Sequence, residues 1–461
     1  MLRLSEALRL PPSPSVAFTG AGGKTTAMLL LADELGPAFI TTTTHLGHWQ
    51  SRLADQHFVW EDGRPMPEIE SLVGQDVTLV TGPLEPELDR YQGLSLPQMN
   101  SLRELAAYRD VPLLIEADGA RQKALKAPAA HEPVVPEFVD MTVVVAGLSV
   151  LTEPLDWEQI HRPEIFAKVA GISVGEPLTP EVVMRMLADQ QGGLRGIPPE
   201  ARRIALLNQA DTPALQAAGG QIAQSLLPAY EGVIVASLGN PNAAGASIFA
   251  VREKVAAIIL AAGESRRFGR TKQLLDYYGR PFVRAVADKA LAAGLDPVIV
   301  VTGCNAEAVE SALAGLPLQI VRNPEWASGQ ASSIRAGLAQ LGPIAPRHPI
   351  SADWGDRHMS VGAAIFLLVD MPQVTAEVLR ALVETHARDL PAVLAPMVQD
   401  RRTNPVLFDR LTFPDLIELT GDVGGRAVFS KYSPAYLPWL DDGLLRDVDT
   451  PDDYGKLMQY E

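Results

Sequence analysis

Two apolar segments each run into a glycine-rich turn that carries a lysine, and this feature constrains the fold more than any other. The first is Val16–Thr26 (VAFTGAGGKTT), followed by a helical pattern over Ala27–Leu35. The second is Val255–Gly263 (VAAIILAAG), followed by a helical pattern over Glu264–Lys272. Strands that alternate with helical patterns are typical of parallel α/β layers. The two turns differ in spacing, so they do not form an internal repeat.

Further apolar runs predict the remaining strands. They lie at Leu113–Ile115, Met141–Ala146, Ile204–Leu207, Val233–Ala236, Val298–Val301, Leu318–Val321, Ala363–Val369 and Ala392–Ala395. The stretch Leu238–Ser247 (LGNPNAAGAS) has the composition of a linker, and 461 residues suffice for two or three domains. We therefore predict two doubly wound, three-layer α/β domains, over residues 1–250 and 251–461. Pro343–Val361 is predicted to be a long loop inserted before a core strand.

The charge limits the classes of partner. Lys and Arg number 39 against 55 Asp and Glu, a formal charge of −16, which argues against broad nucleic-acid binding. The single cysteine, Cys304, excludes a disulfide framework and a multi-cysteine zinc site. The apolar runs are too short to span a bilayer and no secretory signal is visible, so we expect a cytoplasmic protein with no membrane partner. An anionic small ligand stays compatible, because backbone N–H groups, a few cations and Mg²⁺ can hold it.

The stretch Leu260–Lys272 (LAAGESRRFGRTK) has the residues of a phosphate-binding turn. Gly263 and Gly269 would let the backbone close around phosphates, which any Cβ would obstruct. Arg267 and Lys272 would supply cations to a triphosphate and to the charge that develops on its α-phosphorus. On composition alone, a solvated Arg/Lys-rich turn is an equally good interpretation.

Carboxylates downstream are candidates for a metal site. Asp370 ends an apolar strand, where an open parallel sheet presents ligand groups, and Asp449 or Asp447 would join it to hold Mg²⁺. Asp370 is equally suited to cap a turn, and Asp449 to cap a helix that opens at Thr450-Pro451. Both structural roles are compatible with metal binding.

These residues resemble the nucleotidyltransferases of the MobA/MocA type, which attach a nucleotide to the molybdenum cofactor. Further matching segments follow in order, at Pro324–Gly337, Leu368–Pro372, Asn404-Pro405, Gly421–Arg426 and Asp447–Tyr454. The resemblance implies a Rossmann-like nucleotidyltransferase domain in which a terminal phosphate on the pterin attacks the nucleotide α-phosphate and pyrophosphate leaves. It implies a nucleotide site at Leu260, Ala261, Ala262, Gly263, Ser265, Gly269, Gly329 and Ser333, catalytic Arg267 and Lys272, and metal ligands Asp370, Asp449 and Asp447.

The substrate nucleotide is indicated by one position. In this family the first motif reads Leu-Ala-Gly-Gly in guanylyl enzymes and Leu-Ala-Ala-Gly in cytidylyl enzymes. Ala261-Ala262 before Gly263 therefore favour CTP, with GTP possible. Sugar-nucleotide pyrophosphorylases also carry Leu-Ala-Ala-Gly, although they usually lack the terminal Asp447–Pro451 pattern.

The turn Thr19–Thr26 is placed between strand and helix as a P-loop requires. Backbone groups around Gly20, Gly22 and Gly23 would cradle phosphates, Lys24 would reach the β- and γ-phosphates, and Thr25 would ligate Mg²⁺. The usual spacing places glycine where this chain has Phe18, so a purely structural strand–turn–helix remains an alternative.

Two companion segments favour a P-loop-like nucleotide site. Asp118 follows an apolar strand and is a candidate second Mg²⁺ contact. Asn208 and Asp211 resemble the base-reading Asn-Lys-x-Asp turn of GTPases, with Gln209 in place of lysine. That replacement leaves the base undefined.

With Thr41–His45 and Lys126–Pro133, these segments resemble the YqeC-type accessory proteins of selenium-dependent molybdenum hydroxylases. The two resemblances together predict a bifunctional maturation protein, with the molybdenum cofactor as acceptor and a molybdenum hydroxylase apoenzyme as possible partner. A sugar-phosphate or alcohol-phosphate nucleotidyltransferase and a non-catalytic, nucleotide-switched cofactor chaperone are the alternatives. Because both predicted sites bind polyanions in an acidic chain, we expect nucleotide binding to depend strongly on divalent metal.

Overall fold

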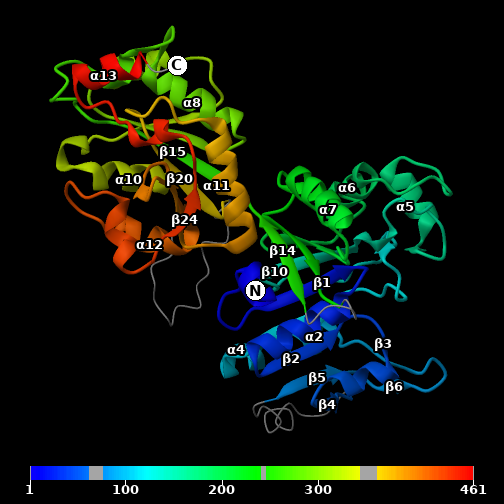
Figure 1. Cartoon of the computed structure of the whole chain (residues 1–461). Coiled ribbons are helices and arrows are strands. Elements are labelled where there is room, and N and C mark those ends of the chain that lie inside the picture. Colours follow the sequence, from blue (N-terminus) through cyan, green and yellow to red (C-terminus); the bar gives the residue numbers. More distant parts are fainter. Residues whose placement is uncertain (1, 62–75, 240–245, 343–360, 460–461) are drawn as a thin grey trace. The chain divides into compact units, whose positions relative to one another are not determined.

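The computed structural model describes residues 2–61, 76–239, 246–342 and 361–459. The chain divides into two compact units, Met1–Arg252 and Glu253–Glu461, shown in Figure 1. Much of the predicted linker, at 240–245, and nearly all of the predicted inserted loop, at 343–360, lie outside the described residues.

The amino-terminal unit is built on a sheet of the order β14-β13-β12-β10-β1-β8-β2-β5-β4, parallel except for β14. β1 lies between β8 and β10, so the carboxyl ends of these strands meet at the point where the chain changes direction across the sheet. The strands are β1 (Ser15–Gly20), β2 (Ala38–Thr42), β4 (Gln56–Val59), β5 (Val77–Thr81), β8 (Leu113–Glu116), β10 (Met141–Gly147), β12 (Arg202–Asn208), β13 (Gly232–Ser237) and β14 (Ser247–Arg252). Short strands β3 (Leu46–Gly47), β6 (Leu84–Glu85), β7 (Arg90–Tyr91), β9 (Leu125–Lys126) and β11 (Ile160–His161) form two small sheets beside it.

Helices cover both faces of this sheet because successive strand residues point to opposite sides. Ala17 and Ile115 share a core with α4 (Leu96–Arg109), and Val144 and Val235 share one with α5 (Pro163–Ala170), α6 (Pro180–Ala188) and α7 (Pro213–Leu226). The other face is covered by α2 (Lys24–Leu35), with α1 (Leu4–Leu8) packed against it. Two short 3₁₀ turns, η1 (His48–Leu53) and η2 (Leu148–Val150), complete the unit, and Leu148 and Val150 of η2 belong to the core that α5, α6 and α7 share.

The carboxy-terminal unit has a second sheet, of the order β19-β18-β15-β20-β23-β21-β22, with β24 beside β21. β15 is parallel to both of its neighbours, β18 and β20. The strands are β15 (Val255–Ala261), β18 (Val298–Thr302), β19 (Gln319–Arg322), β20 (Ala363–Leu368), β21 (Val393–Val398), β22 (Arg401–Arg402), β23 (Val406–Asp409) and β24 (Ala435–Pro438), with a separate pair β16 (Asp276–Tyr277) and β17 (Arg280–Pro281).

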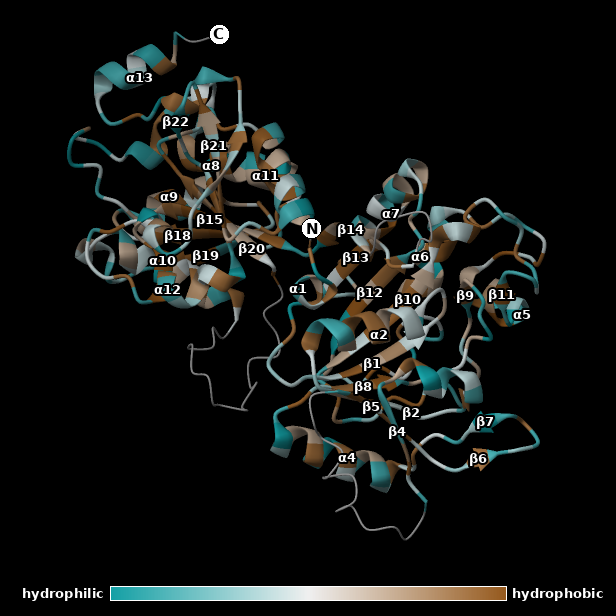
Figure 2. Cartoon of the chain, turned by 60° about the horizontal axis from the view of Figure 1, so that its bottom comes forward, coloured by the Kyte–Doolittle hydropathy of each residue, from teal (hydrophilic) through white to brown (hydrophobic). Residues whose placement is uncertain are grey.

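Two hydrophobic cores, one on each face, make this unit three-layered. Ile259 and Ile365 pack with α8 (Phe282–Ala292), α9 (Ala306–Ala312), α11 (Ala376–Asp389) and α13 (Pro451–Leu457). Ile258 and Phe366 pack with α10 (Gln330–Leu338) and α12 (Phe413–Ile417). Figure 2 shows the apolar strands of both sheets between more polar helices. The predicted fold class, two mixed α/β units with largely parallel sheets, is confirmed.

Short 3₁₀ turns join the elements of the carboxy-terminal unit. They are η3 (Lys272–Leu274), η4 (Trp326–Ser328), η5 (Ala339–Leu341), η6 (Arg410–Thr412), η7 (Gly425–Ser430) and η8 (Asp442–Leu445).

The helix predicted over Glu264–Lys272 is wrong. This segment is an irregular loop that ends at η3, and the first helix of the unit is α8. The backbone of Ser265 (φ 60°) and Gly269 (φ 77°) is left-handed, which is incompatible with a right-handed helix. The helix expected after β1 does form and begins at Lys24.

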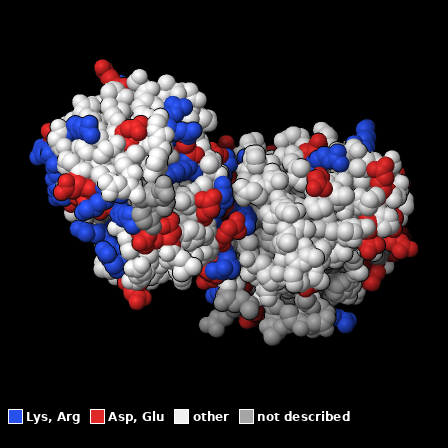
Figure 3. Space-filling model, turned by 45° about the horizontal axis from the view of Figure 1, so that its top comes forward, with Lys and Arg blue, Asp and Glu red and all other residues white. Residues whose placement is uncertain are grey.

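Among the described residues, no helix is both long and apolar enough to cross a membrane. On the face of the carboxy-terminal unit shown in Figure 3, basic and acidic side chains are interspersed. This distribution, with the net charge of −16, gives no support to a nucleic-acid-binding surface on that face.

Candidate functional site

A cleft of about 630 Å³ lies at the carboxyl ends of β15 and β20 in the carboxy-terminal unit. Most of the predicted site residues line it: Leu260, Ala262, Gly263, Ser265, Arg267, Lys272, Gly329, Ser333, Asp370 and Asp449. Ala261, Gly269 and Asp447 are not among its lining residues. The topology therefore brings together residues as far apart in the sequence as Leu260 and Asp449.

Lys272 is held between two carboxylates. Its Nζ lies 3.1 Å from Asp370 Oδ2 and 2.9 Å from Asp449 Oδ1, and it donates to the carbonyl oxygen of Val448 at 2.9 Å. Burial alone would lower the pKa of Lys272, but the two aspartates outweigh it and the pKa is raised. The ammonium group therefore stays charged.

Asp370 and Asp449 differ in environment. Burial raises the pKa of Asp370 despite Lys272, whereas the hydrogen bond from Lys272 lowers the pKa of Asp449. Asp449 also accepts a hydrogen bond from Arg267 at 3.0 Å. Asp447 is exposed and does not line the cleft, although its charge is near enough to raise the pKa of Asp370. Of the two aspartates that the sequence left open, Asp449 is the one that shares Lys272 with Asp370.

The chemistry of this pair fits a divalent cation. Asp370 Oδ1 is buried and has no hydrogen-bond partner within the described residues, and carboxylate oxygens are preferred ligands of Mg²⁺. Among the described residues no group of three or more His, Cys, Asp and Glu side chains is placed to hold a metal. A metal at Asp370 would therefore take further ligands from water and from nucleotide phosphates.

The loop after β15 is shaped by a glutamine that the sequence patterns did not single out. Gln273 is buried and donates to the carbonyl oxygens of Ala261 at 3.1 Å and Gly263 at 2.7 Å. Ser265 Oγ accepts from the Lys272 backbone N–H at 3.0 Å. A Cβ added at Gly263 or Gly269 would meet nothing within 4 Å, so the steric reason expected for these glycines does not hold here. At Gly269 the left-handed backbone itself favours glycine.

Gly329 and Ser333 border the cleft in different ways. A Cβ at Gly329 would lie 2.4 Å from the backbone of Gly421, so glycine allows these two loops to touch. The hydroxyl of Ser333 accepts from Asn323 Nδ2 at 3.1 Å, as that of Ser332 does at 2.8 Å. Asn323 is a buried organising residue that the sequence reading missed. The helix cap proposed for Asp449 is supplied by Thr450, which caps α13 with Asp453.

A second cleft, of about 530 Å³, lies over the turn after β1 in the amino-terminal unit. Gly22, Gly23, Lys24 and Thr25 line it, whereas Gly20, Asp118, Asn208 and Asp211 do not. A Cβ at Gly22 would lie 2.3 Å from the Gly147 backbone nitrogen, so the turn packs directly on the end of β10.

The amides of this turn fall into two groups. The N–H groups of Gly20, Ala21 and Gly22 donate to Asp118 Oδ2, Val145 O and Lys123 O at 3.1, 2.9 and 3.0 Å. Those of residues 23–26, at the start of α2, make no hydrogen bond to the described residues. An anion would therefore bind at the first turn of the twelve-residue helix α2, and the amides of Gly20 and Gly22 are not available to it.

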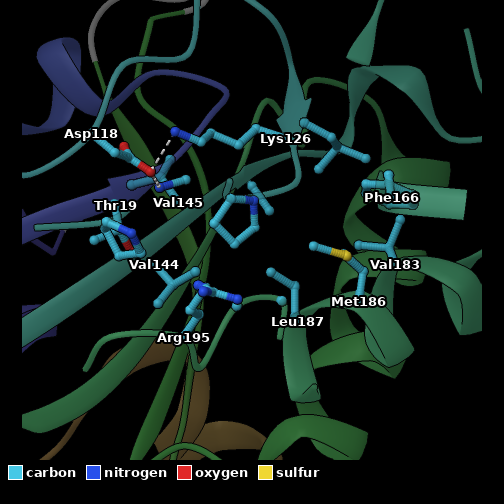
Figure 4. Close-up of a pocket in the computed structure, with 17 residues that line it drawn as sticks. Thr19, Asp118, Lys126, Val144, Val145, Phe166, Val183, Met186, Leu187 and Arg195 are labelled. Carbon is cyan, nitrogen blue, oxygen red and sulfur yellow. Dashed lines mark hydrogen bonds and ion pairs between the residues drawn. The ribbon is translucent and has the colours of Figure 1, made fainter. Parts of the chain in front are cut away.

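A buried chain of alternating charges lies beneath the cleft. Asp118 contacts both Lys24 Nζ at 3.1 Å and Lys126 Nζ at 2.9 Å, and Lys126 contacts Glu132 at 2.8 Å. Figure 4 shows Asp118 and Lys126 joined beside an apolar cavity of about 30 Å³ that Thr19, Phe166 and Met186 help to line. Hydrogen bonds from Arg162 and Lys126 outweigh burial and lower the pKa of Glu132 to about 2. Asp118, predicted to contact Mg²⁺, is thus 2% exposed and surrounded by two lysines.

Glu116, which the sequence reading passed over, is the carboxylate that reaches Thr25. Thr25 Oγ1 donates to Glu116 Oε2 at 3.3 Å, and Glu116 lines the cleft. Burial raises its pKa, with the Lys24 charge opposing that effect. The acidic residues at the end of β8 were the sequence signal for a carboxylate near the turn. Because Glu116 and Asp118 are two positions apart, strand alternation puts both on the same side and does not show which one lines the cleft.

The predicted base-reading residues, Asn208 and Asp211, do not line this cleft. Asn208 is buried, donates to Gly22 O at 2.8 Å and accepts from Leu238 N–H at 3.0 Å. Asp211 accepts a hydrogen bond from Ser237. Asn208 therefore fixes the turn, and the neighbouring side chain that faces the cleft is Gln209.

Comparison with known proteins identifies relatives for each unit. The model of the MobA-like NTP transferase domain matches residues 257–435, and that of the YqeC protein matches residues 16–164. Nicotine blue oxidoreductase of Paenarthrobacter nicotinovorans is 31% identical over 220 residues, which are 44% of this chain and 96% of that protein. The uncharacterized protein YqeC of Escherichia coli is 27% identical over 202 residues, 42% of this chain and 75% of that protein. The crystal structure of Rv0371c from Mycobacterium tuberculosis is 29% identical, covers 45% of this chain and 98% of its own, and has a TM-score of 0.38.

Proposed function

Because this chain belongs to the MobA-like NTP transferase family through its carboxy-terminal unit and carries a YqeC domain in its amino-terminal unit, we propose that it is a molybdenum cofactor cytidylyltransferase. Nucleotidyl transfer is the activity of the family. The proposal adds that CTP is the donor, that the terminal phosphate of a molybdopterin-type cofactor is the acceptor, and that pyrophosphate is released. The observation that carries it is the cleft in which Arg267, Lys272, Asp370 and Asp449 converge.

In this mechanism the protein positions charges and takes part in no covalent step. Arg267 and Lys272 stabilise the negative charge that develops around the α-phosphorus. Ser265 and Gln273 hold the loop on which Lys272 stands, so its ammonium group is placed before substrate arrives. Ala262 and Gly263 line the same cleft and would border the nucleotide.

A divalent cation, Mg²⁺ in this proposal, would be held by Asp370 and Asp449 and would neutralise the phosphates of the nucleotide when bound. The unpartnered Oδ1 of Asp370 supports this assignment. For a metal to bind between Asp370 and Asp449, Lys272 Nζ has to move away from its position about 3 Å from both carboxylates. That movement would bring a cation from the aspartates to the phosphates.

CTP is favoured by Ala262, the methyl-bearing residue in front of Gly263, at the position where the guanylyl enzymes resembled here carry glycine. The YqeC domain in the same chain supports the molybdenum cofactor as acceptor, and a molybdenum hydroxylase apoenzyme in the cytoplasm as the recipient.

The amino-terminal unit would bind a nucleotide by the free amides of α2, with Lys24 on the phosphates. Thr25 and Glu116 are better placed than Asp118 to hold a cation there, because Asp118 is buried between two lysines. Asn208 and Asp211 would position the turn and its neighbouring loop.

The test measures pyrophosphate release by the full chain with Mg²⁺, across CTP, GTP and ATP as donors. Release from CTP that requires the molybdenum cofactor, and a cofactor product heavier by CMP, is the expected result. Release with a sugar 1-phosphate and none with the molybdenum cofactor would replace this proposal by a sugar-nucleotide pyrophosphorylase. No release with any acceptor, together with nucleotide binding that Lys24→Ala abolishes, would favour a nucleotide-switched chaperone.

A further inference from the structure

The cleft of the amino-terminal unit extends past the turn on which a nucleotide would bind. Asn208 contacts the turn, and its neighbour Gln209 lines the cleft. Gln50 Nε2 donates to Thr25 Oγ1 at 3.4 Å, and Trp49 and Arg90 also line the cleft. The volume, about 530 Å³, lies within the range of small-molecule pockets. A phosphate chain on the α2 amides would therefore have further lining residues beyond Thr25.

We propose that this further part of the cleft binds a second ligand, a flat aromatic ring that carries a phosphate group. Trp49 would stack on the ring, and Arg90 and Arg121 would contact the anion. This proposal rests on the proposed nucleotide-binding role of the amino-terminal unit in one respect: the two ligands would occupy the same cleft.

Trp49 stands on a short turn whose start is hydrogen-bonded to its surroundings. Its side chain and backbone together are 57% exposed although it lines the cleft. Gly47 N–H donates to Gln50 Oε1 at 2.8 Å, and His48 N–H donates to Asp89 O at 3.1 Å, which anchors the start of the turn that carries it. A tryptophan offers a large aromatic surface and has only two side-chain torsions to order when a ring stacks on it.

Arg90 lines the same cleft as this tryptophan. In the small sheet of β3, β7 and β6 it is the cross-strand partner of Gly47, two residues before Trp49. Neither Arg90 nor Arg121 forms an ion pair with a described residue, and the described lining contains five Lys and Arg against two Glu. Of those two glutamates, Glu132 is already paired with Lys126 and Arg162. Cations left without carboxylates in a cleft of so acidic a chain indicate an anionic ligand.

Backbone strain is concentrated around the same cleft. Arg121 (φ 50°) and Gln122 (φ 60°) are consecutive left-handed residues, and Arg162 (φ 65°) and Gln209 (φ 61°) are left-handed as well. Such conformations are strained for residues other than glycine and tend to occur where a ligand is held. The Gly22 N–H bond to Lys123 O keeps the 119–123 loop against the turn, so Arg121 stays at the cleft.

Equilibrium dialysis of 1-naphthyl phosphate against the full chain tests the proposal. The dialysis includes Mg²⁺, saturating CTP and non-hydrolysable analogues of ATP and GTP, so that nucleotide sites are filled. We expect one equivalent to bind, and Trp49→Ala and Arg90→Ala each to weaken binding at least tenfold. Trp49→Phe, which keeps an aromatic ring, should stay within threefold of the wild type. The matched controls Trp157→Ala, at a tryptophan of 58% exposure outside the cleft lining, and Arg109→Ala should stay within twofold.

Competition separates this site from the nucleotide site. 1-Naphthol and inorganic phosphate, which each carry half of the chemistry, should bind at least tenfold more weakly. Displacement of naphthyl phosphate by the nucleotides, or unchanged binding in both the Trp49 and Arg90 variants, would overturn the second site. A Lys24→Ala chain that loses nucleotide from this unit but keeps naphthyl phosphate would support two sites. Naphthyl phosphate binding without any nucleotide binding near Lys24 would refute the nucleotide role and leave the second site standing.

Discussion

The two clefts have opposite charge balances. The described lining of the amino-terminal cleft has five Lys and Arg against two Glu, and that of the carboxy-terminal cleft has three Lys and Arg against four Asp and Glu. In the first, two lysines share Asp118, whereas in the second Lys272 lies between two aspartates. We therefore expect the carboxy-terminal cleft to take up a cation before it holds a polyphosphate, whereas the lining of the amino-terminal cleft already has an excess of Lys and Arg.

The two charge clusters also differ in burial. Asp118 is 2% exposed at its side chain and Lys126 is 1% exposed, whereas Asp449 is 38% exposed. A buried charge needs its partner for stability, and a half-exposed charge can exchange its partner for solvent or a metal. We therefore expect mutations in the amino-terminal cluster to affect folding and those in the carboxy-terminal cluster to affect activity.

The largest effect is expected at Asp370. Asp370→Ala removes the partly buried carboxylate that would hold the metal and should lower kcat for pyrophosphate release by about 10³-fold, in the range found when one electrostatic contact to a transition state is lost. Steady-state kinetics of the full chain measures it. Asp447→Ala is the control, because this exposed aspartate does not line the cleft, and should stay within threefold. Equal losses in both variants would contradict the assignment of Asp449 as the partner of Asp370.

The sequence predicted the parallel sheets and the position of Asp370 because both depend on local pattern. Continuous apolar runs such as Ala363–Val369 mark strands buried on both faces, and an aspartate after such a run falls at the carboxyl edge of the sheet. The sequence could not decide between Asp447 and Asp449. The two flank Val448, which is buried and whose carbonyl oxygen accepts a hydrogen bond from Lys272, and only the fold shows which of them faces that lysine.

The next effect is a loss of stability at Asp118. Asp118→Asn leaves Lys24 and Lys126 close together without the carboxylate between them, and should lower the free energy of unfolding by about 3 kcal/mol. Urea denaturation followed by circular dichroism gives the value. Asp449→Asn, at the half-exposed position, should lower it by less than about 1 kcal/mol. If the two variants were equally stable, the contrast between a structural and a functional cluster would be lost.

A smaller effect is expected on metal binding at Lys272. Its Nζ lies between Asp370 and Asp449 and repels any divalent cation that approaches them. Lys272→Met should therefore bind Mn²⁺ about tenfold more tightly in the absence of nucleotide, since even a screened charge at this distance is worth more than 1 kcal/mol. Electron paramagnetic resonance of free Mn²⁺ measures this directly.

Two variants decide whether that Mn²⁺ is at the proposed site. Lys456→Met changes an exposed lysine elsewhere in the unit and should leave Mn²⁺ affinity unaltered. Adding Asp370→Ala to Lys272→Met should remove the gain. Unchanged affinity in Lys272→Met would show that the ammonium group and the metal do not compete.

Other features of the two sites depend on contacts that no local pattern reports. Gln273 and Asn323 organise the carboxy-terminal cleft through buried amides, and neither belongs to a charged or glycine-rich motif. Glu116 reaches Thr25 only because β8 pairs with β1, a contact between residues about 90 positions apart. The irregular loop at Glu264–Lys272 was predicted as a helix, since its polar residues suit a helix surface and the left-handed Ser265 cannot be read from residue type.

The smallest effect is the contribution of His161, in the amino-terminal cleft, to the pH dependence of stability. Burial, reinforced by Arg162 and Lys126, lowers the pKa of His161 from 6.5 to about 4. Between these values the unfolded chain takes up a proton that the folded chain does not, so stability is lost as pH falls from 6.5 to 4. His161→Asn should flatten this part of the unfolding profile by on the order of 1 kcal/mol, a figure reduced for the partial exposure of the ring. Chemical denaturation at several pH values measures it, with His131→Asn, at a side chain of 79% exposure, as the matched control. A profile that His161→Asn leaves unchanged would mean that the positive charges of the amino-terminal cleft do not act on this ring, which would weaken the contrast between the clefts.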